Sequence, residues 1–311
     1  MKSFACLFPG QGSQAVGMGK EFHDRFAEAR DIFARADEAL GYAISKLCFE
    51  GPEEELRMTR NTQPALLTVS MIAFRLLGAE PAAAAGHSLG EYSALVAAGA
   101  LKFEDAVRLV HKRGVYMQEA VPVGTGAMAA VLGADPERLR QALDGVPDRT
   151  VEVANWNSPD QVVIAGSREG VEEALRILKP PRSVMLPVSA PFHTAMMRPA
   201  EERLAADLAL VPFRNPRFPV VCNVDARPIR TGDEARDALR RQVSRSVLWT
   251  ASIEALRGEG IGLWVETGPG KILSGLMKRI GRGWPEPPLV ANIEDPRTLE
   301  NAKQALSEFL S

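Results

Sequence analysis

Gly86-His87-Ser88-Leu89-Gly90, residues 86–90, has the form Gly-x-Ser-x-Gly. This pattern is typical of a nucleophile elbow, a sharp turn between a strand and a helix that exposes a serine hydroxyl. Glycine at both ends permits the turn, because a side chain there would crowd it. Residues 82–85 are all alanine, a poor strand former, so the preceding strand is expected to be fully buried. The alternative is a glycine-rich turn that carries a solvated serine.

Strands alternate with helices on both sides of this turn, which predicts a mainly parallel sheet. The predicted strands are 3–8, 82–85, 219–223 and 263–266. One helix is predicted to begin near Glu21, and the others are 27–40, 65–77, 91–100, 103–120, 199–209, 233–243 and 272–280, with a break at Asn61-Thr62-Gln63-Pro64. An active site is then expected at the carboxyl ends of the strands, where the elbow also lies.

The pattern changes between residues 124 and 188. Strands are predicted at 127–132, 151–155, 161–165 and 182–186. Helices capped by Asp135 and Ser167 are predicted between them. The order β-α-β-β-α-β is the ferredoxin-like unit. We therefore predict a large α/β domain, residues 1–123 and 189–311, with a small inserted domain, residues 124–188.

Composition excludes several classes of protein. The 311 residues are 46% hydrophobic and 24% charged, with a net charge of −2, so bulk charge predicts neither nucleic-acid nor membrane binding. The three cysteines are far apart and form no Cys-x-x-Cys pair, which argues against a disulfide framework and a metal site. The most apolar stretch, residues 64–77, is too short to span a membrane. A cytoplasmic protein is expected.

A serine nucleophile needs a general base, and the chain has four histidines. His87 adjoins Ser88 and should point away from it, while His23 and His111 are expected at the surface. His193 follows a proline-stiffened loop at the predicted domain junction and is the best base by elimination, the alternative being a histidine satisfied by local hydrogen bonds. No third, acidic member is evident. More than a third of the chain follows His193, which counts against an ordinary esterase.

Two further residues invite a functional interpretation. Gln11 lies in the glycine-rich loop 9–14, which matches no nucleotide-binding motif but follows the first strand. Such a loop can lend a backbone N–H to an active site. Arg113 shares an otherwise apolar helical face with Ala106, Val110 and Met117. It is either a structural ion pair or snorkelling side chain, or a clamp for a substrate carboxylate.

Several motifs occur together in order: Pro9-Gly10-Gln11-Gly12-Ser13-Gln14, residues 86–91, Arg113-Gly114, Asn155 with Asn157-Ser158-Pro159, Ser189-Ala190-Pro191-Phe192-His193 and Gly268-Pro269-Gly270-Lys271. From the first strand to about Ile280 the chain resembles the malonyl-CoA:acyl-carrier-protein transacylases of bacterial fatty-acid synthesis. The resemblance implies a hydrolase-like α/β core with a ferredoxin-like insertion. It also implies transfer of malonyl from malonyl-CoA to the thiol of holo acyl carrier protein through a malonyl-serine, without cofactor or metal.

The resemblance assigns roles to individual residues. Ser88 would be the nucleophile and His193 the base of a Ser-His dyad, so no acid is expected. The backbone carbonyl of Gln242 would orient His193, although the sequence after it, Ser246-Val247-Leu248-Trp249, lacks a proline that the family often has. The backbone N–H groups of Gln11 and Leu89 would form the oxyanion hole.

The resemblance also makes Arg113 the residue that holds the malonyl carboxylate. Phe192, next to His193, resembles the residue at this position in relatives that select malonyl rather than methylmalonyl groups. Asn155 is a further candidate for the substrate pocket. An acidic carrier would need a local basic patch, for which the candidates are Arg240, Arg241, Arg245, Lys271, Lys278, Arg279 and Arg282. Three alternatives remain: an acyltransferase that loads a polyketide-synthase carrier, a serine thioesterase or hydrolase, and a binding subunit with a vestigial pocket.

Overall fold

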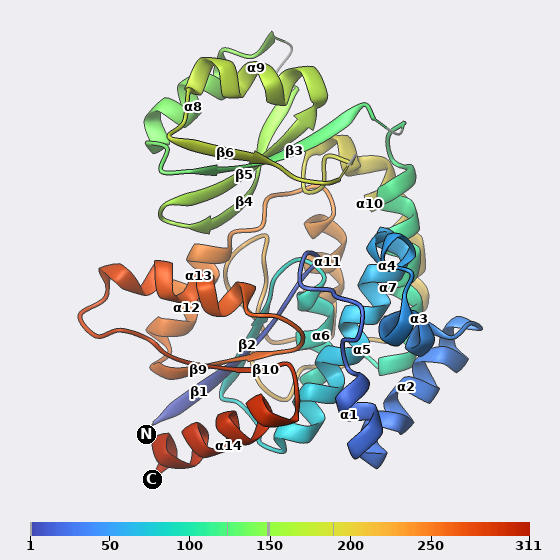
Figure 1. Ribbon diagram of the computed structural model, residues 1–311. Coiled ribbons are helices and arrows are strands. Elements are labelled where there is room, and N and C mark those ends of the chain that lie inside the picture. The colour runs from blue at the N-terminus through green and yellow to red at the C-terminus, as the bar shows by residue number, and fades with distance from the viewer. Residues whose placement is uncertain (1, 123, 148–149, 189) are drawn as a thin grey trace.

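The computed structural model describes residues 2–122, 124–147, 150–188 and 190–311 and contains two sheets (Figure 1). The larger sheet has the strand order β10-β9-β1-β2-β7-β8. Its strands are β1 (Ser3–Phe8), β2 (Ala83–Gly86), β7 (Val220–Val221), β8 (Pro228–Ile229), β9 (Ile261–Thr267) and β10 (Leu289–Ile293). All neighbours are parallel except β7 and β8. The predicted mainly parallel sheet is therefore confirmed.

Helices cover both faces of this sheet. They are α1 (Lys20–Arg25), α2 (Ala27–Leu40), α3 (Ile44–Glu50), α4 (Glu53–Arg57), α5 (Thr59–Leu77), α6 (Gly90–Ala97), α7 (Phe103–Glu119), α10 (Arg198–Leu210), α11 (Gly232–Gln242), α12 (Trp249–Gly258), α13 (Ile272–Ile280) and α14 (Pro296–Leu310). Alternate residues of β1 enter separate hydrophobic clusters, Ala5 and Leu7 on one face and Cys6 and Phe8 on the other. A parallel strand buried on both faces is a continuous apolar run. Ala83, Ala84 and Ala85 of β2 are buried, as their composition predicts.

The smaller sheet is antiparallel, with the order β4-β5-β3-β6. Its strands are β3 (Gly126–Leu132), β4 (Val151–Ser158), β5 (Gln161–Ser167) and β6 (Arg182–Met185). Helices α8 (Pro136–Asp144) and α9 (Arg168–Leu178) lie together on one face (Figure 1), capped by the Asp135 and Ser167 side chains. The predicted β-α-β-β-α-β unit is confirmed. The proposed boundary residues Val123 and Ser189 lie outside the described residues, so the domain limits stay predictions.

One edge of the small sheet is joined to the large part through backbone hydrogen bonds. The Trp156 N–H donates to the Val247 carbonyl, and the Val247 N–H donates to the Ala154 carbonyl, each at 2.9 Å. This contact extends the β4 edge as a short parallel bridge. The opposite edge, β6, is exposed.

The predicted break at residues 61–64 is wrong, because α5 continues through Pro64. Proline lacks the N–H that would bond the carbonyl four residues earlier, which is that of Arg60. The His111 ring Nδ1 lies 3.0 Å from this carbonyl and takes the place of the missing donor. His111 is thus a half-buried partner of α5 rather than a surface residue. Among the α-helices and strands of the described residues, six lie outside the predicted set: α3, α4, α12, α14, β8 and β10.

Candidate active site

Ser88 lies on the turn between β2 and α6 with φ 51°, a left-handed conformation that is unfavourable for a residue with a side chain. A Cβ on Gly86 would lie 1.9 Å from the Gly90 carbonyl group, and one on Gly90 would lie 2.0 Å from the Phe8 carbonyl oxygen. Both positions therefore require glycine. The Gly-x-Ser-x-Gly sequence forms the predicted strand–turn–helix because each glycine removes a direct backbone clash.

His193 lies next to Ser88 although 105 residues separate them in the sequence. Its Nε2 is 2.7 Å from Ser88 Oγ, and its Nδ1 is 2.8 Å from the Gln242 backbone carbonyl at the end of α11. A carbonyl only accepts, so Nδ1 carries the proton and donates to it. The unprotonated Nε2 is therefore the atom that faces the serine hydroxyl.

The electrostatic surroundings keep His193 neutral. The side chain is 3% exposed, and burial, with the nearby charge of Arg113, lowers the pKa of His193 to about 3. A neutral imidazole is the form that accepts a proton. His87, the histidine that lies on the turn itself, is directed to another partner. Its Nε2 lies 2.8 Å from Asn157 Oδ1.

Arg113 on α7 is 1% exposed and is held by neutral groups. Its guanidinium donates to Gln63 Oε1 and Gln242 Oε1, both at 2.9 Å, and to Ser88 Oγ at 3.1 Å. Among the described residues, no carboxylate oxygen lies within 4.0 Å of the guanidinium. The interpretations as a structural ion pair and as a snorkelling side chain are therefore wrong. A buried cation without a counter-ion is suited to an anionic ligand.

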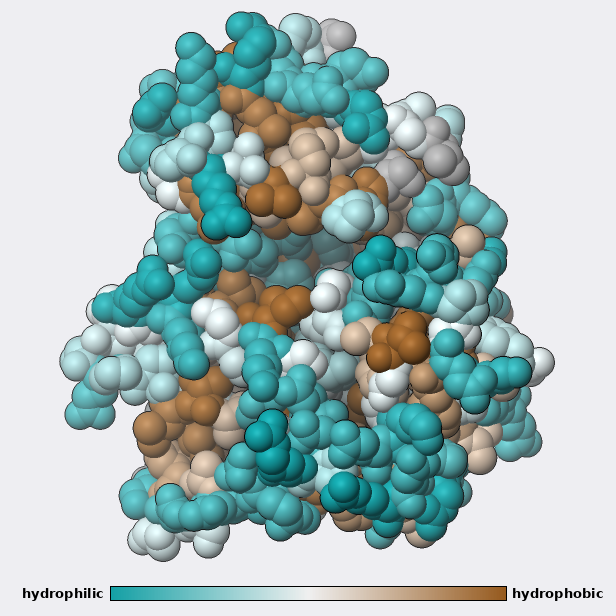
Figure 2. Space-filling model, viewed as in Figure 1, coloured by the Kyte–Doolittle hydropathy of each residue, from teal (hydrophilic) through white to brown (hydrophobic). Residues whose placement is uncertain are grey.

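A cavity of about 120 Å³ adjoins these groups. It is lined by every predicted site residue except Gln242: Ser88, His193, Arg113, Gln11, Leu89, Phe192 and Asn155. Apolar side chains from both parts of the molecule complete it: Met117, Met128, Leu186 and Val188. Figure 2 shows that the visible face is hollowed between the small-sheet part and the rest, with hydrophobic side chains above and below the hollow. The site thus lies between the two sheets, at the carboxyl end of β2.

Sequence reasoning missed two polar residues behind the serine. Asn223 Oδ1 accepts from the Ser88 N–H at 2.7 Å, and Asn223 Nδ2 donates to the Gly86 carbonyl at 2.8 Å. Glu91 Oε2 accepts from the Asn223 N–H at 3.0 Å and from Gln242 Nε2 at 2.7 Å. Glu91 is the single charged residue of α6, an otherwise apolar helix. That isolation is the sequence signal of a buried carboxylate.

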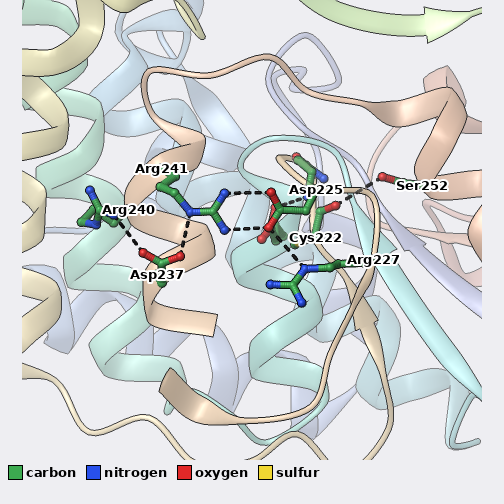
Figure 3. Close-up of polar contacts among 9 residues, drawn as sticks. Cys222, Asp225, Arg227, Asp237, Arg240, Arg241 and Ser252 are labelled. Atoms are coloured by element: carbon green, nitrogen blue, oxygen red, sulfur yellow. Dashed lines mark hydrogen bonds and ion pairs between the residues drawn. The ribbon is translucent and has the colours of Figure 1, made fainter. Parts of the chain in front are cut away.

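Five of the seven basic docking candidates are engaged in ion pairs. Figure 3 shows Arg241 between Asp225 and Asp237. The other pairs are Arg240 with Glu201 and Asp237, Lys271 with Glu294, and both Arg279 and Arg282 with Asp160. Within the described ranges there is no cluster of three His, Cys, Asp or Glu placed to hold a metal. None of the described helices is both long and apolar enough to cross a membrane.

Known proteins resemble the chain over most of its length. The acyl transferase domain family matches residues 5–277. The malonyl CoA-acyl carrier protein transacylase of Escherichia coli (strain K12) is 49% identical over 288 residues, covering 90% of this chain and 93% of that protein. The Bacillus subtilis (strain 168) protein of the same name is 46% identical, covering 99% and 98%.

Solved structures agree in fold as well. The malonyl CoA-acyl carrier protein transacylase of Coxiella burnetii has a TM-score of 0.94 at 41% identity, covering 98% of both chains. A malonyl-transacylase in complex with a type II PKS acyl-carrier protein has a TM-score of 0.93 at 43% identity, covering 97% of this chain and 99% of that chain. Both similarities extend over nearly the whole chain and therefore over both sheets.

Proposed function

The chain belongs to the acyl transferase family and is an acyltransferase, and from this premise we propose that it moves malonyl groups. In the proposed reaction, malonyl passes from malonyl-CoA to the phosphopantetheine thiol of holo acyl carrier protein through a covalent malonyl-Ser88. The observation that carries the proposal is the buried, uncompensated guanidinium of Arg113, 3.1 Å from Ser88 Oγ. The names of the relatives support the choice of donor and acceptor.

In the first half-reaction, His193 Nε2 accepts the Ser88 proton while Oγ forms a bond to the thioester carbonyl carbon. The resulting oxyanion is stabilised by the backbone N–H groups of Gln11 and Leu89. Leu89 precedes the first residue of α6, an end of a helix that favours negative charge. The C–S bond then breaks, and the coenzyme A thiolate recovers the proton from His193. The enzyme is left as a malonyl ester on Ser88.

The second half-reaction runs the same steps in reverse with another thiol. His193 accepts the proton of the carrier's phosphopantetheine thiol, and the sulfur attacks the malonyl ester carbon. The bond to Ser88 Oγ breaks, and Oγ recovers the proton from His193. The Gln242 carbonyl keeps the imidazole oriented in both directions by accepting from Nδ1 at 2.8 Å.

Arg113 gives the reaction its selectivity. A malonyl carboxylate pairs with the guanidinium, whereas an acetyl group leaves a buried cation unpaired, which is a costly mismatch. The carboxylate also compensates the charge that helps to lower the pKa of His193. Binding of malonyl therefore raises the pKa of His193 and makes the imidazole a stronger base. Phe192 limits the room for a branched acyl group, and Asn155 adds a polar group to the cavity wall.

A polyketide-synthase carrier is the second candidate acceptor. It is favoured by the similarity to a malonyl-transacylase solved with a type II PKS acyl-carrier protein. The covalent half-reaction is the same for both carriers, so only the second half-reaction distinguishes them.

The test is the intact mass of the protein after incubation with malonyl-CoA and no acceptor, with peptide mapping of the adduct. We expect a malonyl adduct on Ser88 that holo carrier protein discharges. Rates of discharge by fatty-acid and polyketide carriers identify the acceptor. Free malonate without an adduct would indicate a hydrolase, and an unmodified, inactive protein would contradict malonyl transfer.

A further inference from the structure

Behind the cavity, the Gln242 side chain connects groups that the proposed reaction uses. Its Oε1 accepts from Arg113 at 2.9 Å. Its Nε2 donates to Glu91 Oε2 at 2.7 Å and to the Ser88 carbonyl at 2.9 Å, and lies 3.2 Å from Asn223 Oδ1. The backbone carbonyl of the same residue holds His193. One residue therefore contacts the carboxylate clamp, the base and the serine.

The direction of the Gln242 amide decides whether Arg113 has an acceptor at this one of its three contacts. A carboxamide accepts at one end and donates at the other, and the two ends have nearly the same shape. With the amide reversed, its NH₂ would face the guanidinium, and two donors would oppose each other. Of the three acceptors around Nε2, the Glu91 carboxylate is the closest, and carboxylates are the stronger acceptors.

The backbones on either side of this amide are held by other contacts. Arg241 donates to both carboxylate oxygens of Asp225, at 2.8 and 2.7 Å, and to Asp237 at 2.7 Å (Figure 3). This ion-paired group ties the end of α11, which carries Gln242, to the loop that carries Asn223. With both backbones fixed, rotation of the Gln242 amide about its last bond exchanges its oxygen and its NH₂ without moving the rest of the side chain.

We propose that Glu91 is a positioning residue that sets the direction of the Gln242 amide, and thereby presents Arg113 to the acyl carboxylate. This inference rests on the proposed malonyl transfer. Glu91 touches neither the cavity nor the reacting atoms. Its effect is on the choice between malonyl and acetyl groups, because the His193 contact uses the Gln242 backbone and does not depend on the side-chain amide.

The experiment compares the rates at which malonyl-CoA and acetyl-CoA acylate Ser88 in three proteins: wild type, Glu91→Leu and Glu91→Gln. The leucine removes the acceptor. The glutamine keeps it, because the Asn223 N–H and Gln242 Nε2 both require an oxygen there. We expect the malonyl-to-acetyl ratio to fall about tenfold in Glu91→Leu and to stay within about threefold of wild type in Glu91→Gln. A loss of folded protein lowers both rates together and leaves the ratio unchanged.

Glu266→Leu is the matched control. Glu266 is also fully buried and also accepts two hydrogen bonds, in its case both from backbone N–H groups, those of Leu273 and Ser274, at 3.0 and 2.7 Å. It faces the start of α13 instead of the Gln242 amide. We expect its loss to lower the amount of folded protein without changing the ratio.

An unchanged ratio in Glu91→Leu, or an equal fall in both Glu91 variants, would overturn this inference. If Glu91→Leu does not fold, Gln242→Met replaces it, since it removes the amide and keeps the backbone carbonyl. The same tenfold fall is expected there, and an unchanged ratio would again overturn the inference. A wild-type protein that accepts neither acyl group would overturn the proposed function itself, which separates the two failures.

Discussion

Two turns at the same edge of the large sheet follow similar paths. The first leads from β2 into α6 and the second from β9 into α13, and both strands pair in parallel with β1. The second turn places its left-handed conformations on glycines, Gly268 with φ 139° and Gly270 with φ 81°. The first places one on Ser88, with φ 51°. Of these two turns, the one that places a left-handed conformation on a residue other than glycine is the one whose side chain the proposed chemistry needs.

The two turns also differ in how they use a buried glutamate. Glu266 accepts from backbone N–H groups at the start of α13, an ordinary cap for that helix. Glu91 accepts from Asn223 and the Gln242 side chain, which belong to other parts of the chain. The first turn therefore depends on long-range contacts, while the second is satisfied locally. Paired substitutions at the two turns test this difference when acyl transfer and the free energy of unfolding are measured for each.

The largest effect is expected from Ser88→Ala. Loss of the nucleophile should abolish the malonyl adduct and reduce transfer at least about 10⁴-fold, the scale seen when a nucleophile is removed from a serine enzyme. Ser274→Ala, on the helix after the second turn, should leave transfer within about twofold of wild type. Intact mass and transfer rates measure both. An adduct that persists in Ser88→Ala would show that another residue carries the malonyl group.

Arg113→Ala comes next. A charged partner removed from a buried pair costs about 2–5 kcal/mol, so malonyl transfer should fall about 10²–10³-fold more than acetyl transfer. The cation at the second turn, Lys271, is already paired with Glu294 at 2.8 Å, so Lys271→Ala should leave the ratio unchanged. Parallel acylation rates with the two thioesters give the ratio. Equal losses for both donors in Arg113→Ala would remove it from the clamp role.

Alanine in place of the turn glycines should affect stability unequally. In Gly90→Ala the new Cβ meets the Phe8 carbonyl oxygen, so we expect a loss of at least about 3 kcal/mol in the free energy of unfolding. In Gly270→Ala the nearest atom is 3.5 Å from the new Cβ, so the φ of 81° alone should cost about 1–2 kcal/mol. Urea denaturation measures both. Similar losses would mean that the first turn has room to relax.

The last prediction concerns the pH dependence of stability. Burial raises the pKa of the Glu91 carboxyl to about 7 from an unfolded value near 4.5, against the opposing charges of Arg113 and Arg241. Between these values the folded protein binds a proton that the unfolded chain does not, so stability falls as pH rises. The free energy of unfolding of the wild type, measured relative to that of Glu91→Gln, should therefore fall by about 3 kcal/mol between pH 4.5 and pH 8. Tyr92 and Cys222, which interact with Glu91, have raised pKa values and stay neutral in this range.

Denaturation of the two proteins at several pH values measures this difference. A stability difference that is constant with pH would mean that Glu91 keeps the same charge in the folded and unfolded states.

The sequence predicts local patterns well. The pentapeptide at residues 86–90, the strand at residues 3–8 and the helix at residues 272–280 depend on neighbours in the chain, and the structure contains all three. Arg113 could also be singled out, because a charge on an apolar helical face is a local anomaly. The roles of the site residues remain proposals that the acylation experiment tests.

Long-range contacts could not be predicted from single stretches. The helix α5 continues through Pro64 because His111, from α7, bonds to the Arg60 carbonyl. The side chains of Gln242 and Asn223 contact Ser88 only because the fold places α11 and the end of β7 behind it. Nothing in the sequence near either residue predicts these contacts. Periodicity shows which face of an element is buried, but it does not show what that face contacts.

The two backbone hydrogen bonds between β4 and Val247 limit how the cavity over Ser88 can widen. A rotation that keeps both of them turns the small sheet about an axis along β4, and displacement grows with distance from that axis. The opposite edge, β6, is three strand spacings away, a lever arm of about 14 Å, so a rotation of about 10° moves it about 2.5 Å. Leu186 and Val188, which line the cavity, follow this edge. Such a rotation changes the apolar wall of the cavity that the small-sheet part supplies, while the polar groups around Ser88 stay in place.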